Sequence, residues 1–584
     1  MRMSKMFSRT LHEAPASCET KGYAMLVRAG FIKQLGAGIF DILPLGLRSV
    51  RKIENILREE INAIGGQEVQ LPVVNPADIW RKTGRFDSIG SEMTRLKDRN
   101  NRDLVLAMTH EEAMTELGLF EIDSYKKLPQ LIYQIQTKWR DDPRPRAGLI
   151  RVREFTMKDS YSFDKDYEGL KKQYDAHYDA YFRIFKRMGL PCIAVASDSG
   201  MMGGKVAHEY MYLSEIGEDT IIICEKCGYT ANKQVAKFDK SLAKSPADKE
   251  EAELKKVKTP ETKTISDLCD LLKIKPEETA KAVFFTGIYP GEKEGEKKEK
   301  LIACMIRGDL DVEENKVLNT AKALDMRNAT EDEIRKCGME PGFASLIGAK
   351  GEFVGIMDDS LAGMKSFCTG ANKKDYHYLN ASADRDFKSA VVADISACKA
   401  GCKCPECGHE LISSRGVEIG NIFQLGTRYS DSFGLSYQDE NGEKKSVVMG
   451  SYGIGVGRSL ACLAQEYSDD KGLKLPISVA PYQVQLVSLL KDNAPADEIY
   501  EQLVAAGIEV LYDDRNENAG VKFFDSELIG CPIILKFGNK GLKNGICEVS
   551  LRKSLDKHEE IPLDKLVQTV SILIRQCFEP LKAV

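Results

Sequence analysis

The sequence predicts an α+β domain, an antiparallel sheet with helices, which is split by an inserted α/β domain and followed by a C-terminal α/β domain. Two apolar, strand-like runs flank a loop rich in Pro, Arg and Asp at residues 140–150, as antiparallel neighbours do. The composition changes at Cys224 and changes back after Cys407. From residue 483 onwards, strand-like and helix-like patterns alternate, which indicates a separate domain.

Length and composition exclude several classes of protein. The 584 residues suffice for three or four domains of about 100–200 residues each. No apolar run reaches the roughly 18 residues of a membrane helix, and residues 1–7 lack the apolar core of a secretory signal. We therefore expect no membrane partner. Sixteen cysteines without dense spacing predict reduced thiols in a cytoplasmic protein. The net charge of −5 still permits local basic patches that contact RNA phosphates.

The composition shifts give four segments. Residues 1–223 and 408–474 form the two parts of the split domain, and residues 224–407 form the insert. Residues 475–584 form the C-terminal domain, after a linker marked by Pro476 and Pro481. Within the insert, residues 237–263 are rich in Lys, Glu and Pro and predict a linker.

The loop between the first two strand-like runs concentrates arginines. Arg140 ends one run, and Arg151 and Arg153 begin the next, just before Phe155. Guanidinium groups match phosphate oxygens and stay charged when buried, and an aromatic face can hold a nucleobase. A surface hairpin with solvated charges explains these residues equally well when the segment is taken alone.

A second motif lies more than 300 residues later, where glycines alternate at Gly453, Gly455 and Gly457 before Arg458. Closely spaced glycines let a backbone approach a ligand or another strand. A dinucleotide-binding fold is the alternative, but it needs an acidic residue about 20 positions further on, and Glu466 lies too close.

Together these segments resemble motifs 2 and 3 of class II aminoacyl-tRNA synthetases, and residues 46–72 resemble motif 1. Residues 109–112 (Thr-His-Glu-Glu), 135–140, 153–163 and 422–427 narrow the resemblance to prolyl-tRNA synthetases of the bacterial type, as do residues 28–32 and 43–48. The resemblance covers essentially the whole chain.

The resemblance implies a two-step reaction. Proline and ATP give prolyl-adenylate and pyrophosphate, and the prolyl group then passes to the 3′ end of tRNA(Pro). Positioning and charge stabilisation carry such a displacement, which agrees with arginines in place of a Ser-His-Asp set. The resemblance further implies Mg²⁺ and a homodimer built through the motif 1 region, where we expect an exposed apolar face at residues 53–64.

The site residues that the resemblance implies fall into two overlapping groups. Arg140 and Arg458 are the expected catalytic residues, and Phe155 is expected to stack on adenine. The expected ATP-binding residues are Arg140, Asp142, Arg151, Phe155, Glu418, Gln424 and Arg458. The expected proline-binding residues are Thr109, Glu111, Arg140, Met157, Asp159 and Tyr161. Gly203 and Gly204 are expected to be hinges of a loop that closes over proline.

A carboxylate and a hydroxyl suit the secondary ammonium of proline, and Thr109 and Glu111, two residues apart, can both reach it. The alternative for this segment is a helix start with Thr109 as the N-cap residue and an acidic first turn. The sequence departs from the family pattern at Asp142, where Glu is usual, at Asn421, where His is common, and at Ser451, where Cys or Thr is common.

The insert resembles the deacylase domain of this family and so implies hydrolysis of mischarged alanyl-tRNA(Pro). Alanine can enter a proline site, because a few missing methylenes give only about 1–3 kcal/mol of discrimination. The implied editing residues are Lys281, Gly370, Ala371, Asn372 and His377. Taken alone, Lys281 also suits a solvated helix and His377 a strand edge. The loop at residues 342–348 lacks the proline that the family pattern predicts.

Two pairs of cysteines stand at the two ends of the insert. Cys224 and Cys227 form one Cys-x-x-Cys pair, and Cys404 and Cys407 form the other. Four thiolates bind Zn²⁺ tetrahedrally, so the pairs predict a structural zinc site if folding brings them together. Metal-free cysteines are an equal alternative, and Cys402 is a spare candidate ligand.

Residues 508–532 resemble the anticodon-binding domain shared by several class II synthetases. Unpaired anticodon bases are read by hydrogen bonds and stacking, and Arg515, Lys522 and Arg552 are the expected RNA contacts. The alternative for each of the three is an ordinary charge on the surface of an α/β domain.

Two other functions compete with this interpretation. A threonyl- or seryl-tRNA synthetase is disfavoured by the Thr-His-Glu-Glu segment at residues 109–112 and by the deacylase-like insert. A catalytically silent paralogue that only binds RNA is disfavoured because Arg140 and Arg458 are both present.

Overall fold

The computed structural model describes residues 1–198, 206–241, 252–291, 297–387 and 390–582 and divides into two compact units. The first unit comprises Met1–Ala194, Ser199–Glu218 and Arg415–Val584. The second comprises Val195–Asp198 and Asp219–Ser414, and the predicted insert at residues 224–407 lies within it. Among the described residues, no helix combines the length and apolar character needed to cross a bilayer.

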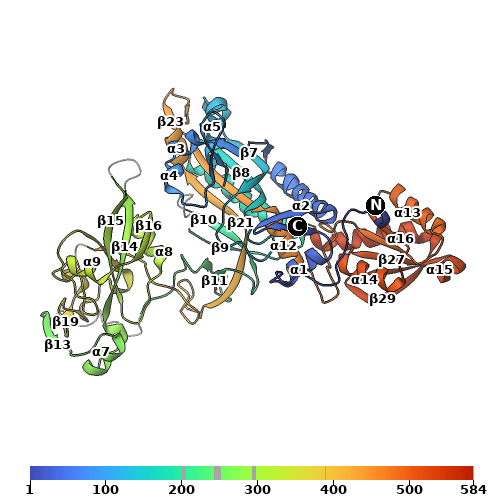
Figure 1. Cartoon of the computed structure of the whole chain (residues 1–584). Helices are drawn as coiled ribbons and strands as arrows, with labels where there is room; N and C mark the ends of the chain where they lie inside the picture. Colours follow the sequence, from blue (N-terminus) through green and yellow to red (C-terminus); the bar gives the residue numbers. More distant parts are fainter. Residues whose placement is uncertain (199–205, 242–251, 292–296, 388–389, 583–584) are drawn as a thin grey trace. The chain divides into compact units, whose positions relative to one another are not determined.

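An antiparallel sheet forms the centre of the first unit, as predicted (Figure 1). Among the described residues the sheet has nine strands; within the first unit they lie in the order β3, β7, β8, β24, β21 and β10, and among these six only β3 joins its neighbour in parallel. The Arg-rich loop joins the antiparallel strands β7 and β8. The bounds are β3 Gln67–Glu68, β7 Gln130–Trp139, β8 Glu154–Asp164, β10 Ala207–Leu213, β21 Ile412–Gly426 and β24 Val448–Gly455.

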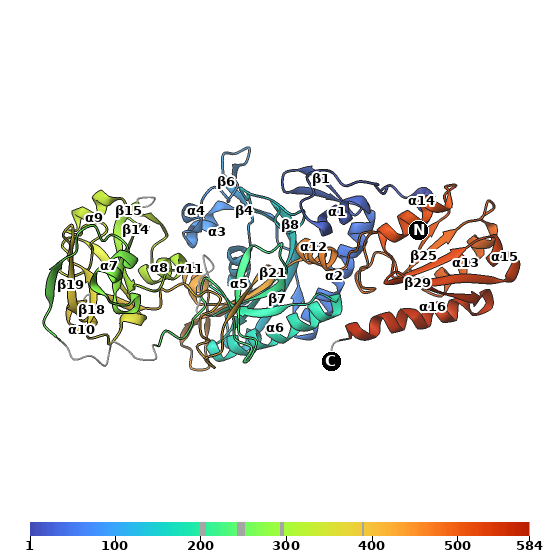
Figure 2. The ribbon, with the colours of Figure 1, turned by 90° about the horizontal axis from the view of Figure 1, so that it is seen from below.

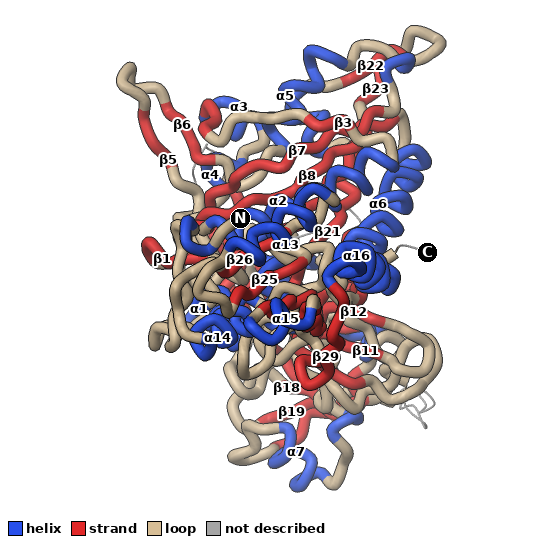
Figure 3. The backbone as a smooth tube through the Cα atoms, turned by 90° about the vertical axis from the view of Figure 1, so that its right-hand side faces the viewer, coloured by secondary structure: helices blue, strands red, loops and turns tan. Residues whose placement is uncertain are grey.

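Helices and small sheets surround these strands in the first unit (Figure 3). The helices are α1 Lys21–Arg28, α2 Pro44–Ala63, α3 Ala77–Lys82, α4 Arg85–Ser88, α5 Glu111–Glu121, α6 Tyr167–Met188, α11 Arg428–Phe433 and α12 Val456–Glu466. The additional strands are β1 Ile32–Gly36, β2 Ile39–Ile42, β4 Val74–Pro76, β5 Arg95–Lys97, β6 Asp103–Leu106, β22 Ser436–Gln438 and β23 Lys444–Ser446, while β9, Ile193–Ala196, spans the boundary between the units.

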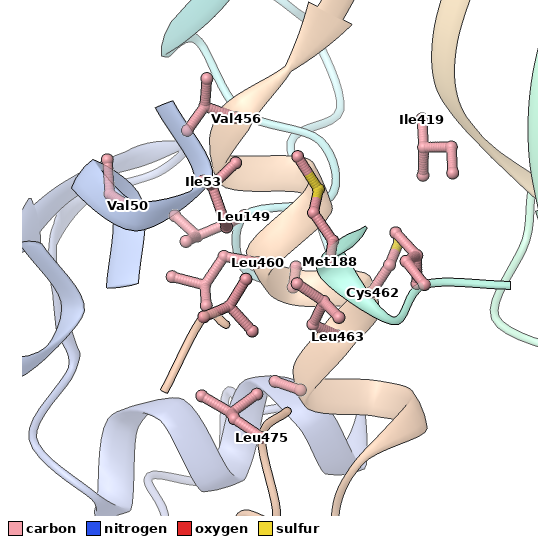
Figure 4. Packing of buried hydrophobic residues seen from close by; sticks show 14 of the residues in the cluster. Val50, Ile53, Leu149, Met188, Ile419, Val456, Leu460, Cys462, Leu463 and Leu475 are labelled. Carbon is pink, nitrogen blue, oxygen red and sulfur yellow. The ribbon is translucent and has the colours of Figure 1, made fainter. Parts of the chain in front are cut away.

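The main core of the first unit forms where α2, α6 and α12 meet the sheet. Ile53 of α2, Met188 of α6 and Leu460 of α12 are all fully buried in it (Figure 4). Burying a Leu or Ile side chain stabilises a fold by about 1.5–3 kcal/mol, so this contact is a major source of stability.

The predicted exposed apolar face on α2 is wrong. Ile53, Leu57 and Ile61 are 0% exposed and Ile56 is 6% exposed, because this face packs into the core of its own chain. The amphipathic pattern of α2 indicated a buried face, but not which surface covers it. A second copy of the chain would have to use a different surface.

The C-terminal part of the first unit is an α/β domain, as predicted, with strand order β26, β25, β27, β28 and β29. The first three strands are parallel, and β28 and β29 continue the sheet in antiparallel fashion. Helix α16 packs along β29 (Figure 2). The bounds are β25 Val484–Ser488, α13 Ala494–Ala505, β26 Val510–Asp513, α14 Ala519–Ile529, β27 Ile533–Phe537, α15 Asn539–Asn544, β28 Ile546–Leu551, β29 Ser554–Pro562 and α16 Leu563–Phe578.

The first residues of the chain pack on this C-terminal domain, although the sequence assigned them to the split domain. The ammonium group of Met1 donates to the hydroxyl of Tyr500 and to the carbonyl of Val510, both at 2.9 Å. Ser4 donates to the carboxylate of Asp514 through its backbone and its hydroxyl. The N-terminus therefore extends the edge of the sheet at β26.

The second unit has a sheet with strand order β16, β14, β15, β17 and β20 and a smaller sheet with order β13, β19 and β18. Its remaining strands, β11 and β12, pair antiparallel beside the first cysteine pair. The bounds are β11 Asp219–Ile223, β12 Thr230–Asn232, β13 Lys255–Lys258, α7 Ile265–Leu272, β14 Ala280–Pro290, β15 Lys297–Arg307, α8 Glu314–Ala321, β16 Asp325–Asn328, α9 Glu331–Lys336, β17 Phe353–Asp358, β18 Phe367–Gly370, β19 Tyr376–Ala381, α10 Ala383–Asp386 and β20 Val391–Ala393.

We predict that the ion pair between Arg552 and Asp469 stabilises the first unit in a pH-dependent way. The two guanidinium nitrogens lie 2.8 and 2.9 Å from the two carboxylate oxygens, and this contact lowers the pKa of Asp469. A lowered folded-state pKa contributes stability above the unfolded pKa of about 4, and this is lost as the pH falls through the folded value.

Asp469→Asn should therefore lower the melting temperature at pH 7, and its difference from the wild type should shrink below about pH 4. Thermal unfolding at several pH values measures this. Asp470→Asn is the matched control, because Asp470 is fully exposed and its pairing with Lys21 is worth little. Equal effects of the two substitutions, or a pH-independent difference, would contradict the prediction.

Candidate functional site

The candidate site lies on one face of the central sheet, where the strand register aligns side chains in rows. Asp159 of β8 lies opposite Gly453 of β24, which in turn pairs with Asn421 of β21. The next row joins Tyr161, Ser451 and Phe423 in the same way. Because alternate residues of a strand face the same side, these rows build one surface from three distant segments.

A cavity of about 210 Å³ lies over this surface. All six expected proline-binding residues line it, namely Thr109, Glu111, Arg140, Met157, Asp159 and Tyr161. Asn421 and Ser451, the departures from the family pattern, line it as well. A Cβ atom at Gly453 would stand 3.0 Å from the amide oxygen of Asn421, so glycine keeps this wall of the cavity open. Five further residues that the sequence did not predict also line it, namely Arg85, Glu92, Met108, Phe423 and Tyr452.

The Thr-His-Glu-Glu segment starts a helix, but Thr109 is not its N-cap residue. Helix α5 begins at Glu111, His110 occupies the N-cap position, and no side chain caps the helix there. The hydroxyl of Thr109 instead donates to Oε2 of Glu111 at 2.6 Å, and both residues are buried. The segment therefore combines a helix start with a hydroxyl–carboxylate pair at the cavity wall.

Asp159 is fully engaged by neighbouring side chains. Lys138 Nζ lies 2.8 Å from Oδ1, while Gln134 and Tyr161 donate to Oδ2 at 3.0 and 2.8 Å. Lys138 is 0% exposed and burial lowers its pKa, with the carboxylate of Asp159 opposing that shift. In the part of the chain that the structure describes, the Glu111 side chain accepts one hydrogen bond, from Thr109, and it engages Oε2. Glu111 therefore has a carboxylate oxygen left for a ligand.

Arg140 supplies positive charge to the same cavity. Its Nε donates to the carbonyl of Met108 at 3.2 Å, and its guanidinium carbon lies 5.3 Å from the ring centre of Phe155. Burial lowers the pKa of Arg140, and the negative charge of Glu418 acts in the opposite direction. A guanidinium pKa starts above 12, so Arg140 stays charged at neutral pH.

The remaining expected ATP-binding residues form two clusters. Arg458 donates to the carbonyls of Ile150 and Glu418 at 2.9 and 2.8 Å and lies 3.4 Å from the Glu418 carboxylate. Arg151 bonds to Asp142 at 2.7 Å and to Glu218 at 2.8 Å. Gln424 of β21, in contrast, lies opposite Gly450 of β24 and does not line the cavity.

Two segments of the second unit meet at the expected editing residues. Asn372, with a left-handed φ of 51°, accepts from the backbone of Ser345 and donates to the carbonyls of Ser345 and Ile347, all within 2.9 Å. A Cβ atom at Gly370 would stand 2.3 Å from the backbone of Phe343, so this approach requires glycine. The loop at residues 342–348 is thus held against the hairpin at residues 370–377 without the expected proline.

His377 and Lys281 lie in different settings. His377 is 6% exposed, its Nδ1 lies 2.6 Å from the hydroxyl of Thr259, and burial lowers its pKa to about 4. Lys281, near the start of β14, has its ammonium 3.3 Å from the Asp311 carboxylate. Ala371 lies between Gly370 and Asn372, and its backbone N–H donates to the carbonyl of Tyr376. His377 is therefore neutral at pH 7, whereas Lys281 is a partly exposed cation.

The four predicted zinc ligands come together in the second unit. The sulfurs of Cys224, Cys227, Cys404 and Cys407 all lie within 4.8 Å of one another. Cys224 and Cys407 are 3.5 Å apart, and Cys227 and Cys404 are 3.6 Å apart. Four thiolates about 2.3 Å from one tetrahedral ion would be separated by about 3.8 Å, so the cluster fits zinc.

The two cysteine pairs also share a backbone fold. Gly228 and Gly408 each follow the second cysteine with a left-handed φ, and each N–H bonds to the carbonyl of the first cysteine at 3.0 Å. The amides of Cys224 and Cys404 each bond to a carbonyl five residues on. Two matching turns thus present their sulfurs to one point.

The structure disfavours RNA contacts for two of the three expected residues. Lys522 is 2% exposed and donates to the carbonyl of Ser488 at 2.6 Å. Arg552 is 3% exposed and pairs with Asp469. Arg515 is 24% exposed but bonds to both Asp513 and Asp525. Each cation is paired within the first unit, and of the three only Arg515 keeps a partly exposed side chain. Gly203 and Gly204, the expected hinges, lie outside the described residues.

Sequence comparisons place these sites in context. Residues 94–467 match the tRNA synthetase class II core domain (G, H, P, S and T), and residues 483–572 match the anticodon binding domain. The proline–tRNA ligase of Salinispora tropica is 49% identical over 572 residues, which cover 97% of this chain and 95% of that protein. The proline–tRNA ligase of Dehalococcoides mccartyi strain 195 is 44% identical and covers 98% of this chain and 99% of its own length.

A solved structure shares the fold. The crystal structure of prolyl-tRNA synthetase from Cryptosporidium parvum complexed with L-proline and AMP matches with a TM-score of 0.57. The match covers 98% of this chain and 79% of that one at 13% sequence identity. At this identity, the likeness concerns the fold alone.

Proposed function

Because the chain belongs to the proline–tRNA ligases, a family of class II aminoacyl-tRNA synthetases, we propose that its 210 Å³ cavity is where proline is activated. In the first step, a proline carboxylate oxygen attacks the α-phosphorus of ATP, and pyrophosphate leaves. In the second, a hydroxyl of the 3′-terminal ribose of tRNA(Pro) attacks the prolyl carbonyl, and AMP leaves.

One observation carries the assignment of this cavity: it presents a guanidinium and a carboxylate to a zwitterion. Arg140 would bind the proline carboxylate and the α-phosphate, and the open oxygen of Glu111 would accept from the secondary ammonium. Asp159 is already matched by Lys138, so it would wall the cavity without competing for the ammonium. Met157 and Tyr161 would contact the ring.

The two arginine clusters suit the triphosphate. Arg151 and Arg458 are now held by carboxylates, and each would exchange part of that pairing for phosphate oxygens. Phe155, beside Arg140, would stack on adenine. The oxygens of Glu418 are ligands that Mg²⁺ prefers, and the ion would neutralise phosphate charge there. Gln424 does not line the cavity, so it would contact the nucleoside only where ATP extends beyond the cavity.

We predict that Glu111→Gln raises the KM for proline in ATP–pyrophosphate exchange by about tenfold to a hundredfold, the cost of a lost hydrogen bond to a charged group. The KM for ATP should stay within about twofold, because Glu111 faces the amino acid. Glu116→Gln on the same helix is the control, since Glu116 pairs with Lys82 at an exposed position. Exchange with threonine or serine but none with proline would refute the proposed function.

We also propose that the second unit hydrolyses alanyl-tRNA(Pro). The clamped loop and hairpin give a rigid surface in a unit separate from the activation site. The backbone at Gly370 to Asn372 would polarise the ester carbonyl, and the proline ring would be too large to enter. The partly exposed Lys281 would contact the phosphate of the tRNA end, while the neutral His377 would support the hairpin wall.

Lys281→Ala is therefore expected to lower the rate of alanyl-tRNA(Pro) hydrolysis at least tenfold, the loss typical of a charged hydrogen bond, and to leave proline-dependent exchange unchanged. Lys399→Ala is the matched control, because Lys399 faces the same carboxylate of Asp311 at 3.5 Å. Deacylation of purified alanyl-tRNA(Pro) measures the effect. Full deacylase activity in Lys281→Ala would remove Lys281 from the site, and stable alanyl-tRNA(Pro) with the wild type would remove the editing function.

We propose further that the four clustered cysteines hold one structural Zn²⁺. The matching turns and the sulfur separations support this over metal-free cysteines. A thiolate site of this kind contributes folding free energy directly, because the unfolded chain offers no preformed site.

Elemental analysis should find about one zinc per chain, the stoichiometry of a four-thiolate site, after growth in zinc-replete medium. Cys407→Ser should lose most of that zinc and lower the melting temperature of the second unit. Cys402→Ser is the control, since Cys402 lies beside the cluster but outside the group of four. Less than about a tenth of an equivalent in the wild type would exclude a site of zinc-finger affinity.

tRNA(Pro) recognition and assembly complete the proposal. The C-terminal domain would read the anticodon, with Arg515 as the remaining candidate among the three expected residues. A homodimer would use a surface other than the buried apolar face of α2.

A further inference from the structure

We propose that Arg85 is a positioning residue for proline binding, which fixes the carboxylate of Glu111 at the cavity wall. The proposal rests on the proposed role of Glu111 as the acceptor for the proline ammonium. Arg85 lines the cavity itself, yet it lies 26 positions before Glu111 in sequence and belongs to none of the three family motifs.

The side chain of Arg85 reaches two adjacent carboxylates. Its Nη1 lies 3.0 and 3.1 Å from the two oxygens of Glu112 and 3.6 Å from Oε2 of Glu111. This is the same Glu111 oxygen that accepts from Thr109. Arg85 and Thr109 thus draw Oε2 to one side, which leaves the other oxygen toward the cavity.

Burial makes this cation necessary. Glu111 is 2% exposed, Glu112 is 0% exposed, and Arg85 is 3% exposed. Two buried carboxylates next to each other in one helical turn repel each other and are costly without a cation. Burial raises the pKa of Glu112, and the charge of Arg85 opposes that shift. One arginine therefore balances only part of the negative charge of the two carboxylates. The remaining negative charge is available to a ligand ammonium.

Several elements hold Arg85 in one orientation. Its guanidinium carbon lies 5.1 Å from the ring centre of Trp80 on α3 and 5.9 Å from that of Tyr429 on α11. Its Nη1 also lies 3.2 Å from the Tyr429 hydroxyl. Gly84, with a left-handed φ of 70°, turns the chain into α4 immediately before Arg85. A planar guanidinium between two rings cannot be replaced by the point charge of lysine without loss.

The test compares steady-state ATP–pyrophosphate exchange by full-length variants. Arg85→Met should raise the KM for proline by about tenfold to a hundredfold, the range for a lost interaction with a charged group. The kcat and the KM for ATP should change by less than about twofold, because the proposed effect of Arg85 on the ligand passes through Glu111, which faces the amino acid. Arg81→Met is the matched control: Arg81 lies four residues earlier, on α3, packs on the ring of Phe86 and pairs with Asp78 and Asp103 on the surface.

A double-mutant cycle separates positioning from a general structural role. If Arg85 acts through Glu111, then Arg85→Met combined with Glu111→Gln should bind proline no more weakly than Glu111→Gln alone. Arg85→Lys retains the charge and carries the test if Arg85→Met does not fold; its KM for proline should rise by a smaller factor.

Three results would overturn the proposal: an unchanged KM for proline in Arg85→Met or Arg85→Lys, additive effects in the cycle, or a parallel loss of kcat and ATP affinity. Absence of proline-dependent exchange in the wild type would instead overturn the proposed function itself, and with it the role of Glu111.

Discussion

The antiparallel register of β8, β24 and β21 is the constraint on which the site depends. A slip of one residue would turn Asp159, Tyr161 and their partners to the opposite face of the sheet. Buried groups behind the sheet secure the register: Lys158 donates to the carbonyl of Tyr452 at 3.0 Å, and the ring of His177 stacks on Tyr452 with centroids 3.6 Å apart. The sheet that forms the floor of the cavity is therefore held by buried contacts on the face opposite the cavity.

Most of the charged side chains buried around the cavity are paired with an opposite charge, and we infer that the charges left without a full partner select the ligand. Lys138 balances Asp159, and Arg85 lies between Glu111 and Glu112. Removing one partner of a buried pair costs about 3–5 kcal/mol, so these sets are stable only as wholes. What they leave over is the charge of Arg140 and one oxygen of Glu111. A small zwitterion satisfies both, whereas a cation or an anion alone satisfies one.

The sequence predicted the parts of this site that lie in contiguous motifs and missed those that depend on distant contacts. Thr109, Glu111 and Tyr161 belong to recognisable segments, and all line the cavity. Arg85 belongs to no recognisable motif, and its role follows from folded-state contacts such as those with Glu111, Glu112 and Tyr429. Lys522 and Arg552 were expected to contact RNA because they are cations. Their partners in the fold, the carbonyl of Ser488 and the carboxylate of Asp469, lie 34 and 83 residues away in sequence and could not be predicted from it.

The same sheet explains how a second unit can interrupt the first without disturbing it. Strands β10 and β21 are antiparallel neighbours, and the chain leaves at Leu213 and returns opposite it at Gly416. The insert is thus a very long hairpin loop, and the entropy of loop closure grows only slowly with length. The two cysteine turns bring the ends of that loop to within 4.8 Å between sulfurs. A metal at this point would close the hairpin below the insert, so that β21 could keep its register, and with it Glu418 and Asn421, whatever the insert binds.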